Sequence, residues 1–341
     1  MQPRPPSVQL PVWKELYAAA ERFRSAQPWE MLDDTDLIGV RNPTTGDTGY
    51  GVVMGNAGTL FGLCLYRGVE GFTMYRRLME GGVDPELDDV YALQNCLKVE
   101  LGLRSDLEPE DLTIIRRLGL KFRGKNVWPQ FRSLLPAYAP WFLTEAEAQF
   151  LTLGLDVTCH HLRRIGMGEV NVSIREKQCL VYSAVRDAEG NYQVGWEPWP
   201  DDGGQLTAPP ILNLSRINAL LAKKTRPDSA WEAGIVHIPA SIRDRERPYY
   251  LRIVVVCQRT SGFVFATEAC PPEAQGNQVL ADTICSSIER HGFLPETIFV
   301  RSVEECDALK ALAKALGFTI RHKKNLTAIR MLKNDMMERF V

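Results

Sequence analysis

Residues 249–264 read YYLRIVVVCQRTSGFV, and this stretch decides how the C-terminal third of the chain is interpreted. Its first nine residues are mostly apolar and include a run of β-branched side chains, a composition that favours a strand. The polar residues 259–262 end in glycine and predict a turn. Another strand is expected over residues 263–269, so the stretch predicts two strands joined by a turn.

The segments on either side extend this pair into a regular series. We expect one more strand before the pair, and after it three helices that alternate with two strands. The strands are expected over residues 235–238, 297–300 and 318–321, and the helices over 277–291, 303–316 and 326–340. The order β-β-β-α-β-α-β-α contains late β-α-β units, which predict parallel pairing through right-handed crossovers. Residues 230–341 therefore predict an α/β domain with a mixed sheet.

This order resembles that of the ribonuclease-H-like fold, and residues 249–264 look like the second and third strands of its integrase-type members. The resemblance covers residues 232–340 and rests on strand and helix order rather than on a motif. Nucleases of this fold need carboxylates at strand ends to hold two metal ions. Here His237 stands in the first strand and Arg301 follows the fourth, where aspartates would be expected. Since a guanidinium repels Mg²⁺, we expect no metal site, no cofactor and no catalytic residue there.

Residues 1–165 predict an α+β domain that contains an antiparallel meander. Short apolar strands over residues 37–40, 50–54 and 60–66 are separated by segments rich in turn-forming residues. Thr144 and Glu147 have the spacing of a capping box, which predicts that a long helix begins there. Residues 166–229 predict a hairpin and a helix that connect the two domains, and the sequence leaves open whether this region belongs to either domain or stands alone.

Composition narrows the classes of partner and compartment. The chain has 341 residues, the length of about two domains, and a formal net charge of −2, which gives no overall attraction to nucleic acid or anionic membrane. Its eight cysteines are scattered without a CxxC pair, which favours a reducing, cytoplasmic location. No apolar run approaches the ~18 residues of a membrane span, so we expect no membrane partner.

Residues 116–132 form the most informative local segment, because they combine six basic residues and three aromatic residues with no acidic residue. Basic side chains contact phosphates and aromatic rings stack on bases, so this composition resembles a surface for single-stranded nucleic acid. The candidate nucleic-acid-binding residues are Arg116, Arg117, Lys121, Arg123, Lys125 and Trp128.

A plainer interpretation of the same segment is favoured on sequence grounds. Phe122, Trp128 and Phe131 would anchor an irregular segment to the core, while the basic groups are solvated or paired with the acidic residues of 80–89. A further basic cluster near the C-terminus has a solvated helix face as its default interpretation. It consists of Arg321, Lys323, Lys324, Arg330 and Lys333.

Cys159, His160 and His161 form the one Cys/His cluster in the sequence. Adjacent residues on a helix point about 100° apart, so the three side chains cannot easily bind one metal ion. The favoured interpretation is the end of a helix with one buried cysteine and partly exposed histidines.

Two function hypotheses remain, and the first is favoured. The first is a non-catalytic binding module for nucleic acid or for a protein partner. The second is a metal-dependent hydrolase or nuclease of unfamiliar arrangement, which would use carboxylates around the C-terminal sheet. These carboxylates are Asp244, Glu246, Glu268 and Asp282. The glycine spacings match no dinucleotide-binding or phosphate-loop pattern, and no GxSxG motif is present.

Five segments of the chain are distinctive when they are taken together: RNP at residues 41–43, MGN at 54–56, LKFRGKNVWP at 120–129, PWFLT at 140–144 and TIFVRS at 297–302. Together they resemble a bacterial family of uncharacterised two-domain proteins, made of domains of unknown function. The resemblance spans nearly the whole chain and implies a bacterial, cytosolic protein without implying an activity, so no catalytic residue is carried over.

Overall fold

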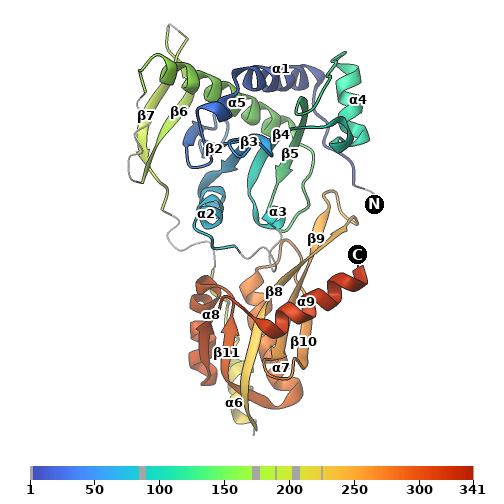
Figure 1. Ribbon diagram of the computed structural model, residues 1–341. Helices are drawn as coiled ribbons and strands as arrows, with labels where there is room; N and C mark the ends of the chain where they lie inside the picture. Colours follow the sequence, from blue (N-terminus) through green and yellow to red (C-terminus); the bar gives the residue numbers. More distant parts are fainter. Residues whose placement is uncertain are drawn as a thin grey trace.

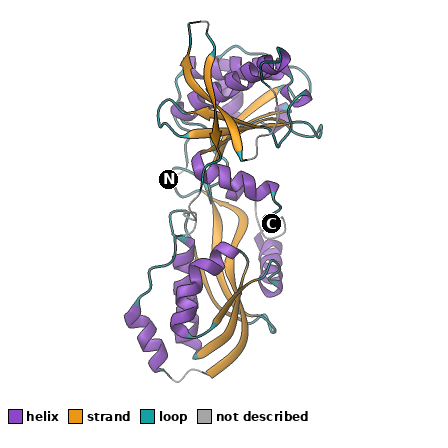
Figure 2. Cartoon of the chain, turned by 90° about the vertical axis from the view of Figure 1, so that its left-hand side faces the viewer, coloured by secondary structure: helices purple, strands orange, loops and turns teal. Residues whose placement is uncertain are grey.

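The computed structural model describes residues 3–83, 90–170, 177–188, 190–201, 208–223 and 226–340. The described strands form two sheets, one in each half of the chain, and the two halves lie one above the other (Figures 1 and 2). Each sheet carries helices and has a hydrophobic core on each of its faces.

The sheet of the N-terminal half has the strand order β5-β4-β3-β2-β1-β6-β7. Its strands are β1 (Leu37–Arg41), β2 (Thr48–Met54), β3 (Phe61–Arg67), β4 (Cys96–Gly102), β5 (Trp128–Leu134), β6 (Gln178–Arg186) and β7 (Tyr192–Pro198). Strands β1 to β5 pair antiparallel with their neighbours, which confirms the predicted meander and lengthens it. Strand β6 pairs parallel with β1 and antiparallel with β7, so the sheet is mixed.

Successive side chains of β3 point to opposite faces of the sheet, so the hydrophobic core of this half has two parts. Leu63 and Leu65 point into a core beneath helices α1 (Leu10–Ala26) and α5 (Glu145–Gly166). Cys64 and Tyr66 point into a second core, which is covered by α2 (Gly68–Met79). The remaining helical segments are η1 (Pro28–Glu30), α3 (Val90–Leu93), η2 (Arg104–Asp106) and α4 (Pro109–Arg117).

A local sequence signal fixes the residue at which helix α5 begins. The Thr144 hydroxyl accepts a hydrogen bond from the Glu147 amide at 3.3 Å, and the Glu147 carboxylate accepts one from the Thr144 amide at 2.8 Å. The predicted capping box is therefore present at the start of α5. The same carboxylate also pairs with Arg67 at 2.6 Å, which ties the start of α5 to the end of β3.

The sheet of the C-terminal half has the order β10-β9-β8-β11-β12. Its strands are β8 (Arg226–Ile242), β9 (Tyr249–Gln258), β10 (Val264–Ala269), β11 (Phe293–Val300) and β12 (Thr319–His322). Strands β8, β9 and β10 are antiparallel, while β11 runs parallel to both β8 and β12. Helices α6 (Leu214–Ala222), α7 (Gly276–His291) and α8 (Val303–Leu316) share one core with the buried Trp231, and α9 (Thr327–Phe340) covers the other face.

The end of the β8–β9 hairpin joins the two halves by main-chain hydrogen bonds. The Tyr250 amide donates to the Ala137 carbonyl at 3.0 Å, and the Ala139 amide donates to the Pro248 carbonyl at 3.1 Å. The guanidinium of Arg247 also donates to the carbonyl of Ser133, at the end of β5. The contact therefore extends β-type pairing from one half into the other.

The expectations for three strands need correction, and each of these strands contains a proline in the part that was not predicted. Residues 128–134, which we expected to be irregular, form strand β5, because Pro129 lies on an edge strand where a missing amide is tolerated. The strand expected at 235–238 already begins at Arg226, and the one expected at 297 begins at Phe293. Pro227 and Pro295 lie in these unpredicted first parts. The connecting hairpin joins the N-terminal sheet through the β6–β1 pairing.

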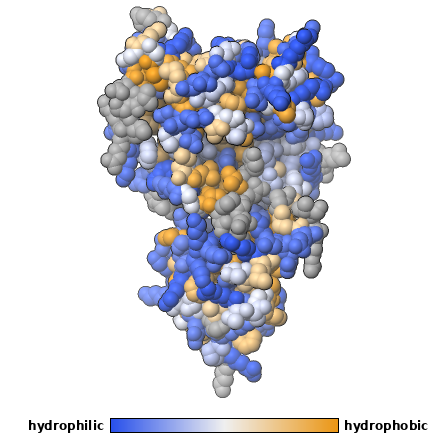
Figure 3. Space-filling model, viewed as in Figure 1, coloured by the Kyte–Doolittle hydropathy of each residue, from blue (hydrophilic) through white to orange (hydrophobic). Residues whose placement is uncertain are grey.

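The face seen in Figure 3 is mainly hydrophilic, with an apolar patch at mid-height near the junction of the two halves. Within the described part of the chain, no helix combines the length and the apolar character that crossing a bilayer requires.

Candidate nucleic-acid interface

Helix α4 ends in a way that creates the candidate interface. Gly119 has a φ of +68°, a left-handed conformation that glycine adopts without strain. The amide of Leu120 then donates to the carbonyl of Ile115 at 3.1 Å, which closes the last turn of the helix. The chain therefore reverses, and residues 120–123, which we call the strap, lie beside α4.

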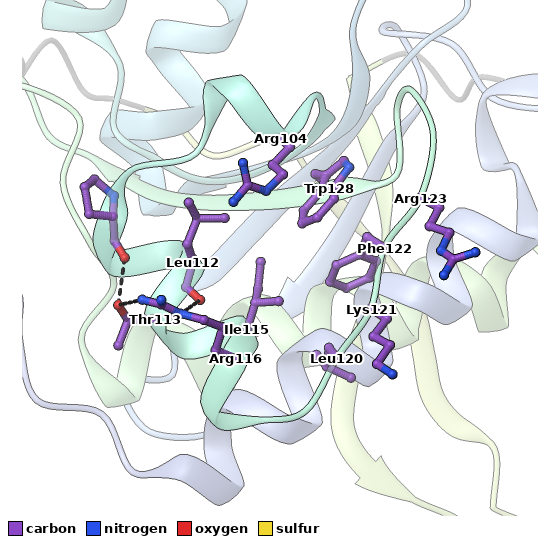
Figure 4. Close-up of a pocket in the computed structure, with 11 residues that line it drawn as sticks. Arg104, Leu112, Thr113, Ile115, Arg116, Leu120, Lys121, Phe122, Arg123 and Trp128 are labelled. Carbon is purple, nitrogen blue, oxygen red and sulfur yellow. Dashed lines mark hydrogen bonds between the residues drawn. The ribbon is translucent and has the colours of Figure 1, made fainter.

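Phe122 anchors the strap to the core. Its ring lies 6.2 Å from the ring of Tyr17 and 5.5 Å from that of Trp128, measured between centroids. Lys121 and Arg123, on either side of Phe122 in the sequence, are both exposed. Figure 4 shows the two cationic side chains turned away from the paired rings of Phe122 and Trp128.

A cavity of about 510 Å³ lies between α4 and the strap. Its apolar part is formed by Leu112, Ile115, Leu120, Phe122 and Trp128 (Figure 4). Its cationic part is formed by Arg104, Arg116, Lys121 and Arg123. Among the described residues that line this cavity, none carries a carboxylate. The combination of four positive charges with an apolar floor that includes two aromatic rings defines the site.

The charges of these four side chains are not neutralised within the described part of the chain. Arg116 donates to the carbonyl of Leu112 at 3.3 Å and to the hydroxyl of Thr113 at 3.0 Å, and both acceptors are neutral. No described residue forms a hydrogen bond or an ion pair with the side chains of the other three, which are all exposed. Unpaired cations gathered around a cavity raise the local electrostatic potential and attract anions.

Arg132, by contrast, belongs to the interior. Its guanidinium bonds to the Asp111 carboxylate at 2.9 and 2.7 Å and to the Glu108 carboxylate at 3.0 Å. Burial alone would lower the pKa of Arg132, but the bonds and charges of the two carboxylates outweigh burial and raise it. This ion pair connects α4 to β5, two of the elements that line the cavity.

The plainer interpretation of the segment fits its three aromatic rings, which all pack on the core, and its solvated alternative fits the basic residues other than Arg132, which are exposed. Phe131 is buried against Tyr17, with ring centroids 5.0 Å apart. Phe122 and Trp128 are only partly buried and line the cavity. Arg132 pairs with α4 instead of residues 80–89, of which 84–89 lie outside the described part of the chain.

The structure separates the six candidate residues. Arg116, Lys121, Arg123 and Trp128 meet at the cavity. Arg117 faces a different hollow on the far side of α4, and Lys125 is exposed in the turn after the strap.

Arg104 was not among the residues singled out by the sequence. It lies in η2, directly after β4, and reaches the cavity because Gly102 of β4 pairs with Trp128 of β5. Recognising residues 128–134 as a strand would have placed Arg104 beside Trp128, but Pro129 obscures that signal.

The Cys/His cluster on α5 is a packing feature, and its expected exposure was reversed. His160 and His161 are both buried, while Cys159 is half-buried. The His161 Nδ1 lies 2.7 Å from the Tyr182 hydroxyl, and the His160 ring packs edge-on against Tyr192.

The carboxylates of the hydrolase hypothesis are dispersed. Asp282 pairs with Arg216, and Glu268 is exposed on β10. Asp244 and Glu246 lie exposed in the loop between β8 and β9. The described residues include no group of three or more His, Cys, Asp or Glu side chains that could hold a metal ion.

The buried His161 leads to an expected pH dependence of stability. Burial, followed by the charges of Arg164 and His160, lowers the pKa of His161 to about 4, against about 6.5 in an unfolded chain. Between these values the unfolded state takes up a proton that the folded state refuses, so the free energy of unfolding decreases as the pH falls. The loss from this group is about 2 kcal/mol at pH 5, and it is absent above pH ~7.

Urea unfolding at pH 5 and pH 7.5 measures this effect. The variant His161→Gln, which keeps a polar group near Tyr182, is expected to lose about 2 kcal/mol less between the two pH values than the native chain. Equal losses in both proteins would show that His161 is not held neutral by the fold.

Comparison with known families gives two matches along the chain. Residues 13–182 match a family model described as "Domain of unknown function (DUF7309)", and residues 216–337 match one described as "Domain of unknown function (DUF6930)". The chain joins a DUF7309 domain to a DUF6930 domain. The residues that line the cavity, from Arg104 to Trp128, lie within the DUF7309 match, whereas the β8–β12 sheet lies within the DUF6930 match. No curated protein matches the chain.

Proposed function

We propose that the DUF7309 domain binds single-stranded nucleic acid in the cavity between α4 and the strap. The observation that carries this proposal is the set of four cationic side chains, unpaired with carboxylates in the described chain, around an apolar floor. Phosphates pair with such cations, and bases stack on rings such as those of Trp128 and Phe122.

The size of the cavity favours a single strand over a duplex. A volume of about 510 Å³ lies within the ~300–1,000 Å³ range of small-molecule sites and suits one splayed-out nucleotide. A duplex keeps its bases stacked inside and offers no such group. An acidic peptide without aromatic residues would also meet the cations, but it offers no flat ring for the apolar floor.

For the DUF6930 domain, we propose a ribonuclease-H-like fold in a non-catalytic role. The sheet order β10-β9-β8-β11-β12, with three antiparallel strands followed by two parallel ones, supports the fold. His237 and Arg301 support the absence of a cation site. Burial is the main cause that lowers the pKa of His237 to about 3, and the nearby positive charges of Arg252, Arg301 and Lys333 lower it further.

The eight cysteines are all free, and six of them are buried. Free thiols in a chain of this length favour a reducing compartment, so we propose a cytoplasmic location.

Fluorescence anisotropy tests the proposed binding. An oligothymidylate of about 12 nucleotides at about 50 mM salt is expected to bind with a micromolar Kd, and a duplex of equal length to bind more weakly. Arg104→Glu is expected to weaken binding about tenfold, because a phosphate contact is lost from an exposed side chain without intramolecular partners. The matched variant Arg290→Glu changes an exposed arginine on α7 and is expected to leave the affinity unchanged.

Two outcomes would contradict the proposal. The first is that Arg104→Glu and Arg290→Glu bind as the native chain does. The second is that a polyglutamate peptide displaces the oligonucleotide at equal concentration, which would assign the cavity to an acidic protein segment.

A further inference from the structure

We infer that the binding site continues over the strap into a second cavity, so that one strand of nucleic acid occupies both cavities and crosses between them at Lys121 and Arg123. This inference rests on the proposed function of the first cavity and adds the length and the path of the ligand. The second cavity has a volume of about 480 Å³ and lies between the strap and α1.

The two cavities have a common wall. Leu120, Lys121, Phe122 and Arg123 line both of them, so the strap separates the cavities while belonging to each. Phe122 contributes its ring on both sides, because it contacts Trp128 in the first cavity and Tyr17 in the second. A polymer that leaves one cavity along this wall therefore enters the other.

The outward direction of Lys121 and Arg123 fits this crossing. Both side chains are exposed at the crest of the strap, and Figure 4 shows them turned away from the apolar floor of the first cavity. Cations in this position contact the phosphates that link two nucleotides, while the bases enter the apolar hollows on either side.

The second cavity adds one unneutralised cation beyond those of the strap. Arg24 also lines it, but its guanidinium bonds to the Glu21 carboxylate at 3.0 and 2.5 Å. Lys14 is exposed on α1 and has no hydrogen-bond or ion-pair partner among the described residues. Lys14 therefore reports on the second cavity and Arg104 on the first, because each lines one of the two and not the other.

Two linked subsites bind a long strand more tightly than a short one. Once the first nucleotide is held, the next binds at a high effective concentration, so affinity rises with length until both cavities are filled. A short oligomer that fills the first cavity gains nothing from Lys14. A longer strand gains one further phosphate contact from it.

The test measures the binding of oligothymidylates of about 3 and about 12 nucleotides to the native chain and to three variants. Arg104→Glu is expected to weaken the binding of both lengths about tenfold. Lys14→Glu is expected to weaken only the longer one, also about tenfold, and to leave the shorter one unchanged. Lys314→Glu, an exposed lysine on α8 in the other domain, is expected to change neither.

The results separate this inference from the proposed function. If Lys14→Glu binds the longer strand as the native chain does, the second cavity is not part of the site. The proposed binding in the first cavity is unaffected by that result. If Lys14→Glu weakens both lengths equally, the lysine acts through general attraction, and the inference is overturned. If the native chain binds neither length, the proposed function itself is wrong.

Discussion

Replacing Asp111 by alanine is expected to lower the free energy of unfolding by about 3–5 kcal/mol, because it leaves the buried guanidinium of Arg132 without its main partner. The side chains of Arg132 and Asp111 are 7% and 5% exposed, so water cannot replace the lost carboxylate. Glu108 remains as a partner, but half of its side chain is in solvent and its interaction is correspondingly weaker. Urea unfolding followed by circular dichroism measures the change.

Glu110→Ala provides the matched control. Glu110 is an exposed neighbour on the same helix, and its removal is expected to change stability by no more than about 0.5 kcal/mol. The double variant Asp111→Leu/Arg132→Met removes both buried charges and is expected to recover part of the loss. A loss below about 1 kcal/mol for Asp111→Ala would mean that the Arg132 guanidinium is not confined to the interior as described.

The double variant Lys121→Glu/Arg123→Glu is expected to weaken the binding of a 12-nucleotide single strand about 100-fold at about 50 mM salt. Each unpaired cation contributes about tenfold through counterion release, and these two residues line both cavities. Their side chains have no described partners, so the fold should be unaffected. Circular dichroism of the variant checks this point.

Arg117→Glu/Lys125→Glu is the corresponding control for that experiment. It reverses two charges within the same basic segment, and both residues are exposed outside the two cavities. We expect it to weaken binding by no more than about threefold. Equal losses for the two double variants would show that binding follows the net charge of the segment instead of the cavities.

Much of the fold could be predicted from local signals. The capping box at Thr144 and the turn-forming residues between β1, β2 and β3 each specify one boundary through contacts made within a few residues. The missed first parts of β8 and β11 contain prolines whose tolerance depends on the position of the strand in the sheet. That position is a tertiary property, which a local pattern does not contain.

The candidate site was only partly predictable for the same reason. Basic and aromatic residues alternate within the strap, so Lys121 and Arg123 could be proposed from the sequence alone. Arg104 and Lys14 reach the cavities from η2 and α1, which approach the strap through strand pairing and core packing. Arg132 has the same charge as its neighbours, and only its buried contact with Asp111 distinguishes it from them.

The salt dependence of single-strand binding tests the central claim most directly. With about five unpaired cations in contact with phosphates, counting Arg104, Arg116, Lys121, Arg123 and Lys14, the slope of log K against log salt is expected to be about −3.5 for the native chain. In Lys121→Glu/Arg123→Glu the slope should become shallower, at about −2, because two of the five contacts are lost. A native slope near zero, or one that this variant leaves unchanged, would contradict binding of a phosphate backbone at the strap.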